Sequence, residues 1–156
     1  MPDISLLNVD PFNLGHTDIL YELLLSRQHS ISHASMPSLK DHRKFCESNP
    51  YRYWYIALED QTPFGSVYVL GDNSVGINID DSHCKHSTVS SLLSLLFKSV
   101  KPLPPIPSVR PPDFFVNVPA SNIRLQCALR QEGYELTAHT FRLAYLGTEE
   151  LINIPV

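Results

Sequence analysis

The chain has 156 residues, a mass of 17.6 kDa, 43% hydrophobic residues and a formal net charge of −4. Its length and apolar content predict one domain over residues 1–156 with a real core, and they exclude a disordered chain. The acidic balance argues against nucleic acid or an anionic membrane surface as a partner. No apolar run reaches the roughly 20 residues of a transmembrane helix, and the N-terminus lacks the basic start of a signal peptide. The three cysteines are an odd, widely spaced set, which predicts a reduced, cytoplasmic protein.

The first part of the sequence predicts one strand and two helices. Residues 4–9 are apolar enough for a strand, and an Asp-Pro turn follows them. Thr17 is placed to cap a helix whose apolar side chains recur at helical spacing. Ser38, with Asp41 three positions later, predicts a second helix that ends near Ser48, before an Asn-Pro pair.

The middle of the sequence predicts a three-stranded antiparallel meander and a buried helix. Residues 51–59, 64–70 and 75–79 are rich in aromatic and β-branched side chains and are separated by turn sequences. Apolar residues then recur with helical spacing over 89–100. The chain has 13 prolines against six glycines, and six of the prolines lie within residues 102–112. This stretch is therefore neither a helix nor a central strand, and we expect a stiff, extended connection within one domain.

The last part of the sequence predicts a short strand, a helix and a longer strand. Residues 114–118 form the short apolar strand, and a helix follows that opens at Asn122 and ends at Gly133. Apolar residues alternate within 134–146, which predicts a strand. The complete order, β-α-α-β-β-β-α-β-α-β, predicts a mixed sheet with helices on both faces.

Three local patterns occur in an order and spacing that one enzyme family shares. They are a hairpin (residues 53–56 with 63–68), the strand after it (75–79), and a helix opened by Asn122 and closed by Gly133 and Tyr134. Together they make the sequence similar to the GNAT superfamily of acyl-CoA-dependent N-acyltransferases. The resemblance implies an α+β, three-layer fold, with a mixed, mostly antiparallel sheet and helices on both faces.

The resemblance also implies a reaction and a cofactor. The protein is expected to transfer the acyl group of acetyl-CoA, or of another acyl-CoA, to a small amine such as an amino sugar or a nucleotide-linked amino sugar. The loop and helix start after the third strand of the meander would hold the pyrophosphate. Members of this class often pair through edge strands, so a homodimer is a further expectation. The residues expected to bind the cofactor are Ile77, Asn78, Ile79, Lys85, His86, Ser87, Thr88 and Asn122.

Several positions depart from the pattern of the family. Where the phosphate-binding loop of the family carries Gln or Arg and two small residues, this sequence has Cys84, Ser87 and Val89. A β-branched valine is expected to crowd the backbone approach that glycine allows. Leu129 stands where many members carry a tyrosine that protonates the leaving thiolate, and leucine cannot donate a proton. These departures favour the alternative of a domain that has lost catalysis and serves as a ligand-binding or protein-interaction module.

Acyl transfer needs a group that accepts the proton of the amine. Asp80 and His83 directly follow the third strand of the meander and are the candidates for this role, acting directly or through water. The alternative is that Asp80 and Asp81 only end the strand and cap the next helix. His33 and Trp54 are the candidates for contacts with the acceptor. The competing interpretations are a solvated loop histidine and a core or groove-lining aromatic residue.

Other titratable residues have mainly structural interpretations. His42, like His33, is expected to be a solvated histidine on the acceptor side. Residues 80–86 hold five potential metal ligands, but no second pair of ligands accompanies them, so no metal site is predicted. Cys84 raises the alternative of a reactive thiol beside a helix N-terminus, although no distant histidine can be paired with it from the sequence.

Overall fold

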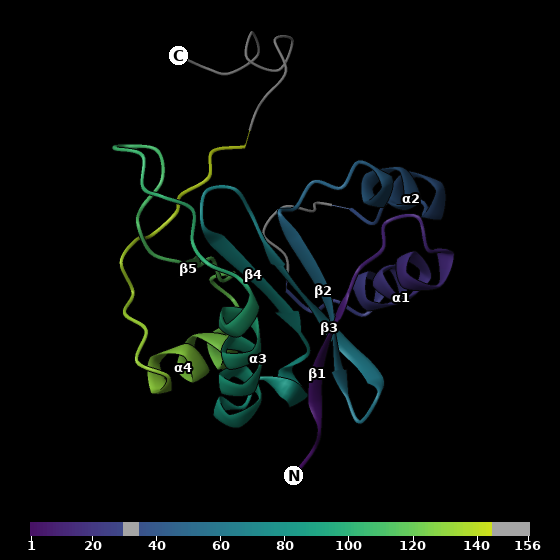
Figure 1. Cartoon of the computed structure of the whole chain (residues 1–156), viewed down its shortest axis with the longest axis horizontal. Coiled ribbons are helices and arrows are strands. Elements are labelled where there is room, and N and C mark those ends of the chain that lie inside the picture. Colours follow the sequence, from purple (N-terminus) through teal and green to yellow (C-terminus); the bar gives the residue numbers. More distant parts are fainter. Residues whose placement is uncertain (30–34, 145–156) are drawn as a thin grey trace, which may run out of the picture.

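The computed structural model describes residues 1–29 and 35–144. Its described part contains one five-stranded sheet, with α1 and α2 on one face and α3 and α4 on the other (Figure 1). This three-layer α+β arrangement is the predicted one. In chain order the elements are β1 (Ile4–Asn8), α1 (Leu14–Leu25), α2 (Leu39–Glu47), β2 (Tyr53–Glu59), β3 (Thr62–Val69), β4 (Ser74–Ile79), the single 3₁₀ turn η1 (Asp81–His83), α3 (His86–Ser99), β5 (Phe115–Val116) and α4 (Ile123–Gln131).

The sheet is antiparallel from β1 to β4 and becomes parallel between β4 and β5. The strands follow the order β1-β2-β3-β4-β5, so the predicted meander forms as a set of sequence neighbours. The parallel pairing is short, because only Ser74 and Val75 of β4 are in register with Phe115 and Val116 of β5. Beyond Val75, β4 therefore has no ladder partner on its β5 side among the described residues.

Two hydrophobic cores lie on opposite faces of the sheet. Because side chains alternate along a strand, Val67, Val69 and Ile77 point to the core under α3 and α4. Trp54 and Ile56 point to the other core, where side chains from α1 and α2 cover them. Helices thus cover each face of the sheet. Groups that contact a ligand must therefore lie at the strand ends or in the spaces between a helix and the sheet. No helix in the described ranges is long and apolar enough to cross a membrane.

Short polar side chains cap the starts of α1, α2 and α4, at two of the three places that the sequence predicts. Ser38 accepts a hydrogen bond from the Asp41 N–H and Asn122 accepts one from the Leu125 N–H, so the predicted starts of α2 and α4 are confirmed. The prediction for α1 is wrong, because the cap is Asn13, whose side chain accepts from the His16 N–H. Thr17 lies inside the helix, where its hydroxyl donates to the Leu14 carbonyl and its side chain is buried.

The predicted strand over residues 134–146 is absent from residues 134–144, which have no regular secondary structure. Residues 145 and 146 lie outside the described part. Phe141 and Leu143 alternate as a strand would require, but they are 93% and 95% exposed. The physical reason is that a strand is stabilised by a hydrogen-bonded neighbour, and β5 offers an edge of only two residues.

Candidate functional site

A cavity of about 690 Å³ lies on the α1 and α2 side of the sheet and extends to the end of β4. Its apolar wall comes from α1, its aromatic wall from α2 and the sheet, and its polar end from the segment around β4. The lining includes Leu20, Leu23, Leu24, Arg27, His29, His42, Phe45, Tyr51, Trp54, Glu59, Asp60, Phe64, Tyr68, Asn78, Asp80, His83, Pro119 and Asn122. A concave site of this size that mixes apolar walls with a few polar groups is typical of small-molecule binding.

Four aromatic rings make one wall of the cavity. Tyr51 stacks on Tyr68 with ring centroids 4.3 Å apart and meets Trp54 edge-on at 4.8 Å, while Phe45 meets Trp54 edge-on at 6.0 Å. Gly76 makes room for this wall, because a Cβ at that position would overlap the ring of Tyr68. Burial raises the pKa of Tyr51 to about 12, so its hydroxyl stays protonated. Trp54 thus serves both the core and the cavity.

Asp80 and His83 meet at the polar end of the cavity. The Asp80 Oδ1 lies 2.7 Å from the His83 Nδ1 and accepts hydrogen bonds from the Ser82 hydroxyl and the His83 N–H. The His83 ring stacks on Phe64 at 4.3 Å, and its Nε2 lies 3.7 Å from the Glu59 Oε2. Burial alone would raise the pKa of Asp80, but these hydrogen bonds lower it overall. A carboxylate and an aromatic ring therefore hold the imidazole in one orientation.

The structural role expected as the alternative for Asp80 is present in the structure. Its side chain caps η1 through the His83 N–H, so one oxygen both shapes the turn and orients the histidine. Asp81 does not cap α3: its N–H donates to the Gln28 side chain at 3.0 Å, and its carboxylate lies 3.2 Å from the His29 Nε2.

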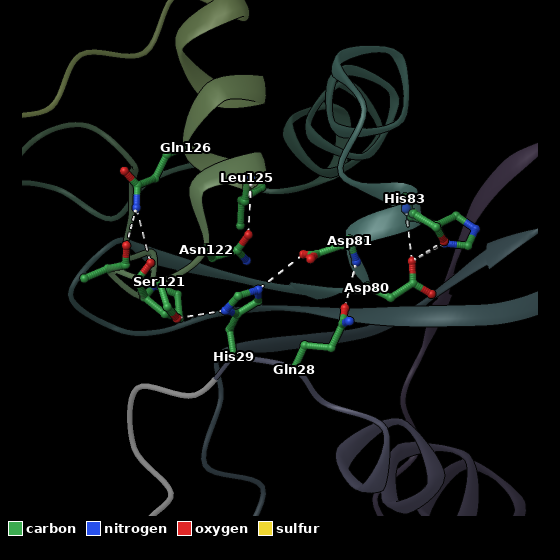
Figure 2. A network of polar contacts seen from close by, with 12 residues as sticks. Gln28, His29, Asp80, Asp81, His83, Ser121, Asn122, Leu125 and Gln126 are labelled. Carbon is green, nitrogen blue, oxygen red and sulfur yellow. Dashed lines mark hydrogen bonds and ion pairs between the residues drawn. The ribbon is translucent and has the colours of Figure 1, made fainter.

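A polar bridge joins the end of α1 to the turns before α3 and α4 (Figure 2). His29 lies at its centre, with Nδ1 2.8 Å from the Ser121 hydroxyl and Nε2 facing Asp81. Gln28 adds the contact to the Asp81 N–H. The residues that meet here are 52 to 92 positions apart, so no local sequence signal could have identified them. The bridge spans the region where β4 has separated from β5.

The three β4 residues predicted to bind the cofactor lie beside the cavity. The side chains of Ile77 and Ile79 are buried in the core under α3, so only their backbone groups are open to a ligand. Asn78 points to the opposite face, where its Oδ1 accepts a hydrogen bond from the Arg27 guanidinium at 2.6 Å. Beyond Val75, the backbone groups of β4 that face β5 have no ladder partner among the described residues.

The predicted phosphate-binding segment forms the first turn of α3. Lys85 is the N-cap residue and makes no capping bond with its side chain. Lys85, His86 and Ser87 are exposed, whereas Thr88 is buried. The first N–H groups of a helix have no intrahelical partner and attract anions. The expectation that Val89 crowds this approach is wrong, because its side chain is fully buried in the core.

Glu132 lies beside the same helix start. Its carboxylate oxygens lie 2.6 Å from the His86 Nε2 and 3.0 Å from the Ser90 hydroxyl, which donates to it. A carboxylate here uses part of the positive potential that a pyrophosphate would need. The pattern of the loop alone did not indicate this residue, because it lies 46 positions after His86.

The remaining residues that the sequence analysis singled out lie in different parts of the structure. Asn122 is 4% exposed, caps α4 and lines the cavity, whereas Leu129 is packed in the core. His33 lies outside the described residues. The expectation of a solvated His42 is wrong: α2 carries it into the interior, where it is 5% exposed and its Nε2 lies 3.1 Å from the Thr17 carbonyl.

The alternative of a reactive thiol at Cys84 is also overturned. The side chain is buried, and burial together with the nearby Asp81 and Asp80 carboxylates raises its pKa to about 11. A thiol with such a pKa is a poor nucleophile at neutral pH. Among the described residues, no three His, Cys, Asp or Glu side chains converge as a metal site would require.

Comparison with solved structures shows that this architecture is similar to that of several acetyltransferases. An acetyltransferase from Thermus thermophilus superimposes with a TM-score of 0.60 at 12% identity, covering 85% of this chain and 86% of that one. The aminoglycoside N-acetyltransferase AAC(6')-Ib11 gives 0.54 at 16% identity, with 84% and 85% covered. An aminoglycoside acetyltransferase from an uncultured soil metagenomic sample, solved in complex with sisomicin, gives 0.54 at 13% identity, with 93% and 97% covered.

The protein has the GNAT fold. The structural likeness extends over most of both chains, and it agrees with the resemblance drawn from the hairpin, β4 and α4 patterns. No protein-family model matches the sequence, and no curated protein matches it. At identities this low the structural superposition establishes the fold alone, and the chemistry has to be argued from the side chains of this chain.

Proposed function

We propose that the protein is a cytoplasmic, GNAT-type N-acyltransferase that uses acetyl-CoA, or another acyl-CoA, and acylates a small amine. One observation carries the proposal: the unpaired edge of β4 ends at an oriented Asp80–His83 pair that opens into a cavity of about 690 Å³. A thioester carried along that edge would meet an amine held in the cavity. The exposed first turn of α3, with Lys85 beside it, is the part of the chain that suits the pyrophosphate.

The residues around β4 have distinct parts in the proposed reaction. Acyl-CoA supplies the activated acyl group as a thioester. Backbone N–H groups at the free β4 edge donate to the thioester oxygen as charge develops on it. His83 takes a proton from the amine as the amine nitrogen forms a bond to the acyl carbon, and Asp80 stabilises the imidazolium. The carbon–sulfur bond would break, and the thiolate would take a proton from water because Leu129 has none to give. The proton that His83 took from the amine would pass to the resulting hydroxide.

Calorimetric titration with acetyl-CoA tests the cofactor. We expect a dissociation constant below about 1 mM and one site per chain. Weaker binding would contradict the enzyme proposal and favour the alternative, a GNAT-like module that binds a ligand or a protein without catalysis. The Glu132 carboxylate at the α3 start and the buried Leu129 are the observations that favour this alternative.

His83→Ala tests the catalytic part of the proposal. Loss of a general base lowers the rate by roughly 100-fold or more, so we expect kcat to fall by that amount for any accepted amine. Amino sugars and nucleotide-linked amino sugars belong in the first screen. The affinity for acetyl-CoA should change less than threefold, because His83 lies at the polar end of the cavity and not at the α3 first turn. His16→Ala is the matched control, since His16 lies outside the cavity lining. An unchanged kcat in His83→Ala would remove His83 from the mechanism.

A further inference from the structure

Arg27 places a cation in the wall of the cavity. It follows the C-terminus of α1, and its side chain lines the cavity. One terminal nitrogen donates to the Asn78 side-chain oxygen at 2.6 Å. The Nε is buried and has no hydrogen-bond partner. Among the described residues no carboxylate forms an ion pair with Arg27.

A half-buried guanidinium without a counter-charge is unfavourable beside apolar groups. The Nε of Arg43 is likewise buried without a partner among the described residues, but the guanidinium of Arg43 lies 3.1 Å from the Asp18 carboxylate and so has a counter-charge. Arg27 instead lines the cavity that the aromatic residues also line. The positive charge of Arg27 lowers the pKa of Tyr51, but burial has the larger effect and raises this pKa to about 12. The cavity therefore contains a positive charge with which no described acidic side chain forms an ion pair.

The position of this charge along β4 relates it to the proposed reaction. Asp80 follows Asn78 by two residues in extended backbone, so the two side chains share a face and lie about 6–7 Å apart along the chain. The polar end of the cavity carries Asp80, Glu59 and His83, which suit an amine. Arg27, bonded to Asn78, suits an anion. The spacing fits a small molecule whose amine and anionic group are a few bonds apart.

We propose that Arg27 is the anion-binding residue of an acceptor subsite, and that the acceptor is a small amine that also carries a carboxylate or a phosphate. The identification of this ligand as an acyl acceptor rests on the proposed function. The four aromatic rings and the three leucines of α1 around the subsite favour an acceptor with an apolar or ring-shaped body. The anion would accept hydrogen bonds from guanidinium N–H groups of Arg27 that have no acceptor among the described residues, such as Nε.

Binding of matched pairs to the protein without acyl-CoA tests the subsite. L-phenylalanine and L-phenylalaninamide differ in one carboxylate, and glucosamine 6-phosphate and glucosamine differ in one phosphate. In at least one pair we expect the anionic member to bind about tenfold or more tightly, as a charge-assisted hydrogen bond implies. The pair that shows the difference identifies the source of the anion. Equal binding within both pairs, or no binding by either anionic member, would overturn the proposal.

Variants assign the effect to Arg27. Arg27→Gln should remove most of the preference for the anionic member and leave the neutral member within about twofold. Arg27→Lys should retain part of it, because lysine keeps the charge but lacks the planar fork. Arg43→Gln is the matched control and should behave as the wild-type protein. Circular dichroism and the thermal midpoint report whether each variant is folded. A full preference for the anion in folded Arg27→Gln would overturn the assignment.

Acyl transfer, measured separately, keeps the two proposals distinguishable. Anion binding through Arg27 without transfer from acetyl-CoA would leave the subsite in place and contradict the enzyme proposal. Transfer to the anionic members with a kcat/KM that Arg27→Gln does not change would support the enzyme and remove the subsite.

Discussion

Single side chains perform several structural tasks in this chain, and Asn73 shows this most clearly. It is fully buried in the turn between β3 and β4 at a positive φ of 72°. Its amide nitrogen donates to the Leu103 and Pro111 carbonyls at 2.9 Å, and its oxygen accepts from the Leu103 N–H at 2.8 Å. One side chain thus ties both ends of the proline tract to the sheet.

We predict that Asn73→Ala lowers the free energy of unfolding by about 2–4 kcal/mol, because buried carbonyl and N–H groups lose their partners. Asn73→Gly is the informative comparison. Glycine tolerates the positive φ, so a similar loss in both variants assigns the effect to the hydrogen bonds. Urea denaturation measures it. A loss below about 0.5 kcal/mol in either variant would show that the proline tract does not need this anchor.

Asp80 gives a prediction for the pH dependence of stability. Its pKa is lowered in the folded protein despite burial, because Ser82 and His83 donate to it. A lowered folded pKa stabilises the protein above the unfolded value, and this stabilisation is lost as the pH falls from about 4 through the folded value. Asp80→Asn should therefore flatten the acid side of the stability profile, measured by denaturant unfolding. Asp113→Asn, at an exposed position, should not. Profiles of equal slope would contradict the assignment.

At the scale of elements, the end of α4 contacts the start of α3, where we propose that the pyrophosphate binds. The α3 first turn offers N–H groups that no side chain caps, and Lys85 adds a positive charge. Glu132, the C-cap of α4, contacts the same turn through His86 and Ser90. If the pyrophosphate binds at this turn as proposed, its affinity is set by a balance between the two helix ends, because the N–H groups and Lys85 attract it and Glu132 opposes it.

We predict that Glu132→Gln increases the affinity for acetyl-CoA about two- to fivefold, since a charge at a helix N-terminus is worth roughly 0.3–1 kcal/mol. The gain should diminish at high salt. Glu135→Gln removes an equal charge from an exposed position three residues away and serves as the control. Calorimetric titration of both variants measures the difference. Weaker binding in Glu132→Gln would mean that Glu132 orders the site instead of competing with the ligand.

At the scale of the whole molecule, the described chain carries an apolar segment that it does not bury. Leu136, Phe141 and Leu143 are each more than half exposed after α4. They lie in the segment for which the sequence predicts a strand, and β5 pairs with β4 alone among the described strands. We propose that two copies associate through this segment, as a homodimer.

Analytical ultracentrifugation at about 50–100 μM should find a dimer, and the double variant Phe141→Glu and Leu143→Glu should be monomeric because charges at an apolar interface oppose burial. Val109→Glu, also at an exposed apolar position, is the control and should remain dimeric. The thermal midpoint of the double variant should equal that of the wild-type protein at a concentration low enough to make the wild type monomeric. A wild-type monomer at these concentrations would contradict the proposal.

Local patterns in the sequence determined the meander, the buried helix α3, and the caps at Ser38 and Asn122, because alternation and short polar caps act within a few residues. They also identified Asp80 and His83, which are close in sequence and meet through a single turn. Only the tertiary structure decided the contacts of Arg27 with Asn78, of His29 with Asp81 and Ser121, and of His86 with Glu132. Each joins residues more than 40 positions apart, and such pairings follow from how elements pack, which no local pattern encodes. The same reason explains residues 134–144: alternation supplies a strand-forming pattern, but a hydrogen-bonded neighbour has to come from the rest of the fold.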